Sequence, residues 1–383
     1  MKTRDPGSHV IGAMRRLATP WAIALDRADR VQAGRLGQGS LIDIACGSSL
    51  QLAAYCSVLG RPGVGIDMDP ECIAASAKTM EKALDADLLE ASSLLCGDCL
   101  RPDDLGLDPA RRFALLHLDP GRPSDVQRHT LEEMTPDPLA ALAAWWDRVS
   151  GAPAEKMAIL DLSPRLSYQQ CAELDSGLAD GFSDVSRTWE WTSQGRGRVD
   201  RLSVWIAGAA SPGKRARYVR IPPGGERSSK VLEAESVPWE SDEPLGSGEQ
   251  PEVGESISLI DPALLASGVE RELIPADGDH RWVRRTGRRP LLVHPAESSW
   301  LSALGMLVRT AQVRELVDVD PEQSVEPLIE AGCRLDFNRL TLRLSMQPSL
   351  HPLRQRELDR GLPDEGSAGF VLRLPSGMLA ICV

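Results

Sequence analysis

The sequence predicts an α/β protein with a doubly wound, seven-stranded sheet, a short N-terminal helical segment and a smaller C-terminal α+β domain. Three observations lead to this prediction. Short apolar runs alternate with helical stretches from residue 41 to about 208, which is typical of parallel strands covered on both faces. An acidic segment follows, and the strand pattern changes after it. The chain has 383 residues, the length of two or three domains.

The first predicted element is helical. Apolar side chains recur at spacings of three or four between residues 8 and 36, so we assign residues 1–40 to an N-terminal helical segment. A domain over residues 41–230 follows. Its strand candidates are residues 41–45, 63–67, 92–98, 113–119, 157–162, 187–191 and 201–208.

Residues 231–256 are predicted to be an acidic linker, because eight acidic and no basic residues lie between Glu233 and Glu255, among Pro, Gly and Ser. Residues 257–383 are predicted to be a separate α+β domain. Helices are expected at 321–331 and 350–360. The last two strands are expected to pair antiparallel, because the turn between them is short.

Charge and composition limit the function classes. The chain is 42% hydrophobic, which excludes wholesale disorder, and it has no run of 18 uncharged apolar residues. Its N-terminus lacks the apolar stretch of a secretory signal, so a cytoplasmic protein without membrane association is expected. The eight cysteines follow no repeating frame, and the lone Cys96-x-x-Cys99 has no second pair, so neither disulfides nor a metal site are expected.

Net charge is −12, but residues 196–230 carry nine basic and two acidic side chains. The negative net charge therefore does not exclude a polyanionic partner.

A turn of small residues follows the first predicted strand. Asp43 ends the strand, and Ala45 and Gly47 lie in the turn Ala-Cys-Gly-Ser-Ser, before a helical stretch. Small residues let a ligand approach the backbone at a helix N-terminus. A tight strand-to-helix turn also needs small residues for structural reasons alone, so both interpretations stand.

Further acids follow the next strands. Asp67 ends the second strand, about 20 residues beyond the first turn, where a carboxylate can accept hydrogen bonds from ribose hydroxyls. Asp98 follows the third strand and Asp119-Pro120 the fourth. Because the carboxyl ends of parallel strands share one edge of a sheet, these acids predict a ligand cleft there.

With these residues in place, positions 41–208 resemble the catalytic domain of class I S-adenosylmethionine-dependent methyltransferases, whose sheet is Rossmann-like. The resemblance implies that Asp43, Ala45 and Gly47 border the methionine part of the cofactor. It implies that Asp67 holds the ribose and Asp98 meets the adenine. Ala45 and Ser49 stand at two positions where that family has glycine.

The stretch LLHLDPGRP (115–123), with TPDPLAAL after it and LDLSPRLS at 160–167, is more specific. It is similar to motifs of a bacterial and archaeal methyltransferase family with a C-terminal THUMP-like domain. The resemblance implies that Asp119 and Pro120 orient the acceptor, and that Arg122, Ser163 and Pro164 contact it. Members of that family usually carry Lys where this chain has Asp161, a change from positive to negative.

The resulting hypothesis is methyl transfer from S-adenosylmethionine to a base of tRNA or rRNA. The 196–230 segment and the arginines between 281 and 289 are predicted to contact the RNA. Two rival hypotheses stay open: a small-molecule methyltransferase, and a non-catalytic protein that binds the cofactor or RNA. His117, inside an apolar strand, is predicted to be a core residue and not a base.

Overall fold

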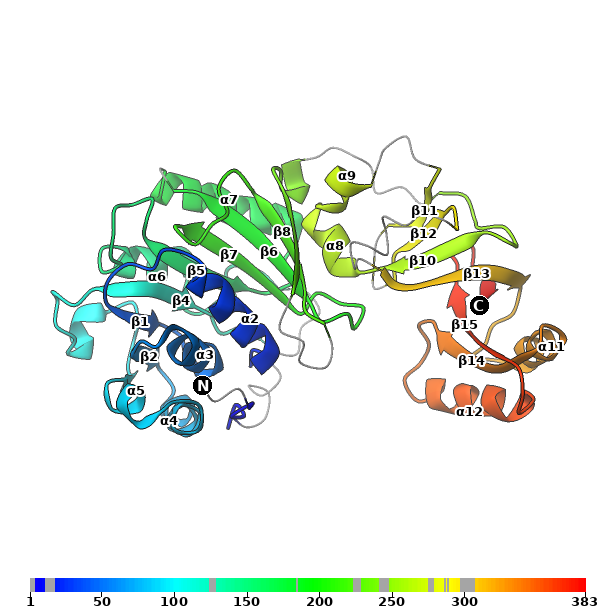
Figure 1. Ribbon diagram of the computed structural model, residues 1–383, viewed down its shortest axis with the longest axis horizontal. Helices are drawn as coiled ribbons and strands as arrows, with labels where there is room; N and C mark the ends of the chain where they lie inside the picture. The colour runs from blue at the N-terminus through cyan, green and yellow to red at the C-terminus, as the bar shows by residue number, and fades with distance from the viewer. Residues whose placement is uncertain are drawn as a thin grey trace. The chain divides into compact units, whose positions relative to one another are not determined.

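The structure is a computed structural model that describes residues 4–10, 18–123, 129–183, 185–222, 229–240, 248–274, 279–285, 287, 289–296 and 307–383. The chain divides into two compact units, which Figure 1 shows in the order of the chain from blue to red. The first contains residues 1–242 and 266–272, and the second contains residues 243–265 and 273–383. Within the described residues, no helix is long and apolar enough to cross a membrane.

The described strands of the first unit form one sheet in the order β3-β2-β1-β4-β5-β7-β6-β8-β9. They are β1 (Ser40–Asp43), β2 (Gly63–Asp67), β3 (Ser93–Cys96), β4 (Phe113–Leu118), β5 (Met157–Leu162), β6 (Arg187–Ser193), β7 (Arg201–Ala207), β8 (Ala216–Arg220) and β9 (Lys230–Ala234). The five strands from β3 to β5 pair in parallel, whereas β7 is antiparallel to both β5 and β6. The doubly wound α/β fold is confirmed, and all seven predicted strands are present.

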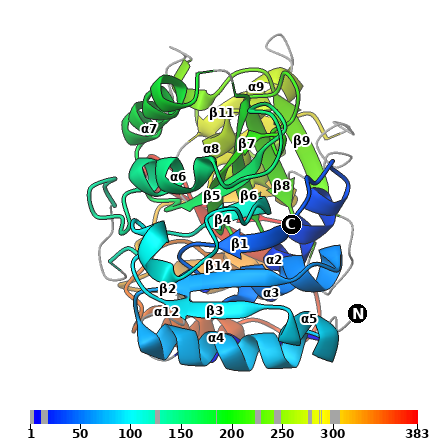
Figure 2. The ribbon, with the colours of Figure 1, turned by 90° about the vertical axis from the view of Figure 1, so that its left-hand side faces the viewer.

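Helices cover both faces of this sheet. They are α2 (Trp21–Gln32), α3 (Leu50–Leu59), α4 (Pro70–Ala83), α5 (Ala86–Glu90), α6 (Pro138–Trp146) and α7 (Tyr168–Gly181), with short 3-10 turns at Pro102–Leu105 and Pro238–Glu240. In Figure 2, α6 and α7 lie on one side of the strands, and α2 and α3 on the other. Side chains at the helix starts fix several of these turns: Asp69 accepts from Glu71 N, and Ser167 forms a capping box with Gln170.

The N-terminal helix is shorter than predicted. Residues 8–10 are not helical, residues 11–17 lie outside the described part, and α2 begins at Trp21 after Pro20. Pro20 is extended (ψ 135°), which ends any continuous helix from residue 8. α2 packs against α3, and its buried side chains Ala24, Ala28 and Val31 belong to the core of the first unit. This helix is therefore an integral part of that unit.

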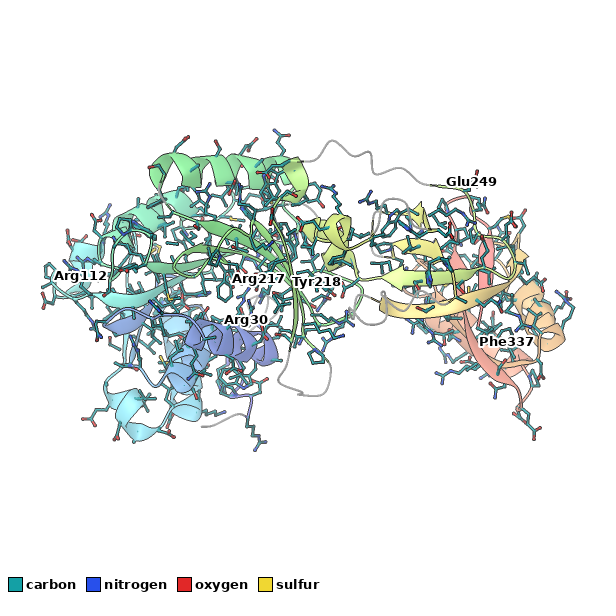
Figure 3. All side chains as sticks on the ribbon, turned by 45° about the horizontal axis from the view of Figure 1, so that its top comes forward. Arg30, Arg112, Arg217, Tyr218, Glu249 and Phe337 are labelled. Atoms are coloured by element: carbon teal, nitrogen blue, oxygen red, sulfur yellow. The ribbon has the colours of Figure 1, made fainter. Side chains whose placement is uncertain are left out.

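Two strands were not predicted. β8 lies within the basic 196–230 segment, and β9 occupies residues 230–234, where the acidic linker was expected to begin. Each strand carries two charged residues, but Arg217 of β8 is buried and pairs with Glu190 of β6 and Glu233 of β9, 3.0 and 2.9 Å away. Figure 3 labels Arg217 and Arg30, which both contact Glu190. Ion pairs with the neighbouring strands thus allow the charged Arg217 side chain to be buried in β8.

The strands of the second unit lie in the order β11-β12-β10-β13-β16-β15-β14. They are β10 (Ser256–Ile260), β11 (Arg281–Arg284), β12 (Leu291–His294), β13 (Leu307–Val317), β14 (Phe337–Arg343), β15 (Ser367–Arg373) and β16 (Leu379–Cys382). β14 and β15 are parallel, and the predicted antiparallel pairing of the last two strands is confirmed. The helices α11 (Glu326–Arg334) and α12 (His351–Gly361) pack on β14, and the short α8 (Pro262–Ser267) and α9 (Glu270–Leu273) follow β10.

The arginines between 281 and 289 make contacts inside the second unit. Arg281 pairs with Glu255, and Arg284 donates to the carbonyl of Arg289 at 2.7 and 2.9 Å. The Arg285 guanidinium lies over the Trp282 ring, 5.5 Å from its centroid. Arg288 lies outside the described residues. Several of the predicted RNA-contact residues thus also stabilise the unit itself.

Candidate functional site

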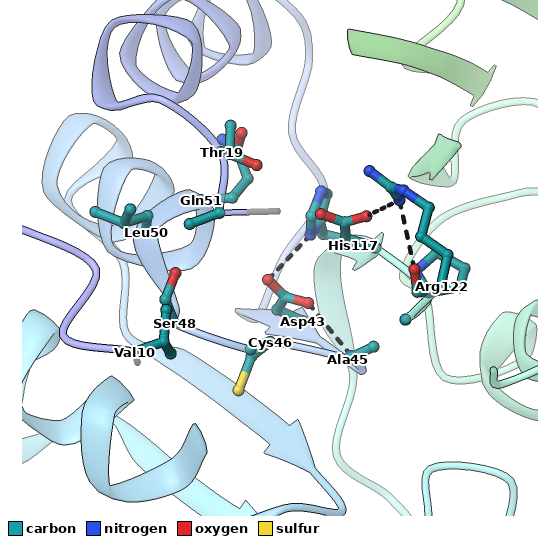
Figure 4. A pocket seen from close by; sticks show the side chains of 15 residues that line it. Val10, Thr19, Asp43, Ala45, Cys46, Ser48, Leu50, Gln51, His117 and Arg122 are labelled. Carbon is teal, nitrogen blue, oxygen red and sulfur yellow. Dashed lines mark hydrogen bonds and ion pairs between the residues drawn. The ribbon is translucent and has the colours of Figure 1, made fainter. Parts of the chain in front are cut away.

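A pocket opens at the carboxyl edge of the first sheet, where β1 and β4 lie side by side (Figure 4). The chain leaves these two strands toward opposite faces, and this is the place where open α/β sheets bind ligands. The pocket is lined by Val10, Ala18, Thr19, Asp43, Ala45, Cys46, Gly47, Ser48, Leu50, Gln51, His117, Asp119, Pro120, Gly121 and Arg122. Six of the ten predicted site residues are among them.

The turn after β1 leaves its backbone open to this pocket. Gly47 has a φ of +50°, and no atom lies within 4 Å of the position that a Cβ would take. Ser49 also has a positive φ, 53°, as a glycine there would. Its side chain is buried and donates to Ser76 Oγ at 2.9 Å, and Ser76 Oγ in turn donates to the carbonyl of Gly47. The serine therefore keeps the glycine conformation while its side chain stays out of the pocket lining.

Asp67 holds this turn from the next strand. Its Oδ2 accepts from Gly47 N and its Oδ1 from Asp69 N, both at 2.9 Å. Burial raises the pKa of the Asp67 carboxyl, and these two backbone donors oppose the rise. A carboxylate has about four acceptor sites, so two donors leave capacity for a ligand.

Asp98 lies at the end of the neighbouring strand. Gly97 N donates to the carbonyl of Asp67 at 3.0 Å, and the Asp98 carboxylate accepts from Leu100 N at 2.9 Å. Asp67 and Asp98 do not line the pocket, but they lie at consecutive strand ends beside it. Two apolar side chains next to these acids are exposed, Met68 by 65% and Leu100 by 41%.

The loop after β4 brings a charged pair into the pocket. Arg122 Nη1 donates to Asp119 Oδ1 at 3.0 Å and to the Pro120 carbonyl at 3.5 Å. Gly121 and Thr135 exchange both of their backbone hydrogen bonds, which fixes the loop. The Asp119 side chain keeps 23% of its surface exposed, whereas that of Arg122 keeps 5%. Arg122 thus binds the acid of its own loop.

Ser163 and Pro164, predicted to contact the acceptor, do not line the pocket. Ser163 is buried, and its Oγ contacts His129 Nδ1 and accepts from Arg165 N at 3.2 Å. Burial, together with the charges of Arg122 and Arg165, lowers the pKa of His129. The loop after β5 therefore contacts His129, and His129 lies close enough to Arg122 to be affected by its charge.

Nine residues that line the pocket were not predicted as site residues, and Thr19, Gln51 and His117 are among them. The prediction of a core position for His117 is confirmed by its burial, but the ring faces a carboxylate. The strand register places it opposite Asp43, and His117 Nδ1 lies 3.0 Å from Asp43 Oδ2. Only the register of β1 against β4 could have revealed this contact.

The sequence suggested that Asp161 adds negative charge to the cleft. The structure shows instead that Asp161 does not line the pocket. It is completely buried in β5, and its Oδ2 accepts from Arg27 Nη1 of α2 at 2.6 Å. The guanidinium lowers the pKa of this carboxyl although burial alone would raise it. The resemblance implies a positive side chain at position 161, and in this chain Arg27 of α2 supplies that positive charge.

All eight cysteines are free thiols, with Cys96 exposed and Cys99 buried. In the part of the chain that the structure describes, no group of three or more His, Cys, Asp or Glu side chains is arranged to hold a metal ion.

No protein-family model matches the sequence, and no curated protein matches it. Among solved structures, a methyltransferase candidate from Porphyromonas gingivalis is similar over 94% of this chain and 79% of its own, with 15% identity and a TM-score of 0.56. An rRNA methylase from Streptococcus thermophilus matches 47% of this chain and 93% of its own, with 11% identity and a TM-score of 0.35.

A glycopeptide N-methyltransferase complexed with S-adenosylmethionine matches 48% of this chain and 93% of its own, with 12% identity and a TM-score of 0.34. TM-scores this low carry no argument about function. The Porphyromonas structure, in contrast, supports the comparison of folds. The chain has the mixed α/β fold of Rossmann-like methyltransferases.

Proposed function

We propose that the protein transfers a methyl group from S-adenosylmethionine to an acceptor bound beside Asp119. The observation that carries this proposal is the hydrogen bond from Gly47 N to Asp67 Oδ2. It joins an open-backbone turn after β1 to an acid at the end of β2, at the edge of a sheet with methyltransferase strand order. A nucleoside with a charged tail needs this combination of open backbone and acceptor carboxylate.

The residues around the turn fit such a cofactor. Asp67 would accept from the ribose hydroxyls with its remaining lone pairs, and Gly47 leaves room for the tail above the turn. Met68 and Leu100 expose apolar surface beside Asp67 and Asp98, where a purine ring would cover it. When bound, S-adenosylmethionine supplies an electrophilic methyl and its own leaving group, so the protein needs to provide proximity and alignment.

Asp119 and Pro120 are proposed to orient the acceptor. Arg122 occupies Asp119 Oδ1 and contacts the Pro120 carbonyl, but Asp119 is still partly exposed and can accept from an amine of the acceptor. A carboxylate that accepts a hydrogen bond aligns an N–H donor more firmly than a neutral acceptor does.

The finer proposal is that the acceptor is a base of tRNA or rRNA. Its support is a group of arginines around this loop: Arg122 and Arg165 both act on the pKa of His129, and the Arg122 charge also acts on buried Arg201. Arg122 pairs with Asp119, but arginines on the acceptor side of the pocket still favour an anionic acceptor such as a nucleotide.

A small molecule is the second candidate acceptor. Arg201 and Arg217, which the sequence assigned to a nucleic-acid surface, are buried in the first sheet. Lys214 and Arg215 pair with Glu235 and Asp175. This part of the chain therefore offers a nucleic acid less free positive charge than the sequence suggests.

Two measurements test these proposals. Calorimetry with S-adenosylmethionine and S-adenosylhomocysteine should give saturable binding at a single site, and no binding would overturn the cofactor assignment. Methyl transfer from labelled donor should then be followed into RNA and into small metabolites, both taken from cells that lack the gene. Label in RNA with affinity that falls steeply as salt rises supports the RNA acceptor, whereas label confined to small molecules supports the second candidate.

A further inference from the structure

Four ionisable side chains from four elements meet at the wall of the pocket, and two of them, Asp43 and His117, line it. His117 on β4 lies between Asp43 at the end of β1 and Asp161 on β5, with its Nδ1 3.0 Å from Asp43 Oδ2 and its Nε2 3.6 Å from Asp161 Oδ2. Arg27 of α2 donates to the same Asp161 oxygen at 2.6 Å. All four side chains are at most 2% exposed, and Figure 4 shows the contact of His117 with Asp43. We call these four residues the buried charge cluster.

Charge balance decides the state of the histidine. Two buried carboxylates against one guanidinium would leave an uncompensated negative charge, which is costly away from water. A second positive charge on His117 brings the cluster to neutrality. Each ring nitrogen lies within 4 Å of a carboxylate oxygen in a contact that lacks hydrogen-bond geometry, so the attraction to the two carboxylates depends on the charge of the ring. Burial favours the neutral ring, but the charges of Asp43 and Asp161 outweigh it and raise the pKa of His117 to about 10.

Charged groups also surround the cluster. Glu190, which pairs with Arg30 and Arg217, acts on the charge of Arg27, and the charge of Asp161 acts on buried Arg201. Tyr55 of α3 makes an edge contact with the His117 ring, with centroids 5.7 Å apart, and burial raises the pKa of its hydroxyl. Ser203 of β7 accepts from Arg27 Nη2 at 3.2 Å, and Gln51 of α3 accepts from Arg27 Nη1 at 3.5 Å. Gln51 also lines the pocket. Arg27 of α2 is therefore connected to the pocket through Gln51 and, separately, through Asp161 and His117.

We propose that His117 is a positioning residue that stays protonated at neutral pH and holds the Asp43 carboxylate at the wall of the pocket, and that Arg27 acts through Asp161 to keep the cluster neutral. This inference rests on the proposed function, because the part of the site that it positions is the cofactor turn. Asp43 lines the pocket, and its Oδ1 lies 3.4 Å from the backbone N of Ala45 in that turn. An imbalance of charge behind Asp43 would therefore be felt where the cofactor binds.

Isosteric variants test the charge balance. His117→Gln gives the cluster a charge of −1, Asp161→Asn gives +1, and the double variant returns it to zero. We expect each single variant to weaken binding of S-adenosylhomocysteine about tenfold, and the double variant to come within about threefold of the parent, because opposite imbalances cancel. Losses that simply add in the double variant, as for two unrelated packing defects, would overturn the proposal.

A second readout does not depend on the cofactor. NMR of the histidine rings in the full chain, assigned by comparison with His117→Gln, should show His117 as an imidazolium at pH 8, and Asp161→Asn should lower its titration midpoint. A neutral ring at pH 8 overturns the proposal even if the cofactor binds. If the parent binds no cofactor but the ring is charged and responds to Asp161→Asn, the proposed function fails and the charge assignment stands. If His117→Gln does not fold, the His117 signal is assigned by replacing the other five histidines one at a time, and Asp161→Asn then decides the titration test.

Discussion

Replacement of Met68 by alanine tests the cofactor assignment at a residue that the fold does not need. Met68 directly follows Asp67 and is 65% exposed, so the protein gains little from it in the absence of a ligand. Complete burial of a methionine side chain stabilises by about 1.5–3 kcal/mol. If a purine ring covers the exposed part, the contribution to binding is about 1–2 kcal/mol, so Met68→Ala should weaken affinity about five- to thirtyfold.

Calorimetric titration with S-adenosylhomocysteine measures this loss. Leu353→Ala is the matched control, because Leu353 on α12 is also a half-exposed apolar side chain, with 48% of its surface accessible, and it belongs to the second unit. Denaturant unfolding of both variants should lie within about 0.5 kcal/mol of the parent, as for other exposed positions. If Met68→Ala binds as tightly as the parent while the parent binds well, the nucleoside does not lie at the ends of β2 and β3.

Three further predictions concern the acids. Asp67→Ala should weaken cofactor binding about 10- to 100-fold, because Gly47 N loses its acceptor together with the ribose contact, and Asp67→Asn, which keeps one acceptor oxygen, should lose less in the same titration. Asp119→Ala should suppress kcat and leave the Kd for the cofactor within a few-fold; equal loss of both in steady-state and binding assays would place Asp119 in the cofactor site. Burial opposes ionisation of Glu190, but Arg30 and Arg217 outweigh it and lower its pKa to about 2, below the usual 4.5. The stability that this carboxylate contributes is therefore present above pH 4.5 and is lost as pH falls toward 2, and unfolding of Glu190→Gln should depend less on pH in this window than that of the parent.

The sequence predicts the central strands well because of where they lie. β1, β4 and β5 are buried on both faces, so each is a mainly apolar run that ends at the carboxyl edge of the sheet. An acid stands at or directly after the end of β1 and β4. The turn after β1 was predictable for the same reason, since a backbone open to a ligand needs small residues such as Gly47.

What the sequence could not predict depends on contacts between distant residues. β8 has charged residues at two of its five positions, and Arg217 in it is buried through its pairing with Glu190, 27 positions away. Arg27 and Asp161 are separated by 134 positions, and no local pattern links them. Residue spacing gives the edge of the sheet at which acids gather, but the partners of each acid follow from strand order and register.

The departures of this chain from the methyltransferase pattern are matched by second residues, and this bears on whether the protein is an enzyme or a binding relic. Ser49 takes the backbone conformation of the glycine that it replaces, and Ser76 holds its hydroxyl away from the pocket. Asp161 carries a negative charge where the sequence resemblance implies a positive one, and Arg27 pairs with it inside the first unit. A site without selection for ligand binding has no need to keep an open turn and a neutral wall at the same time, because unmatched changes there would cost only stability. The rival hypothesis of a relic therefore loses the support that it drew from these two positions. It still has Ala45 and Arg122, which binds the acid that we assign to the acceptor.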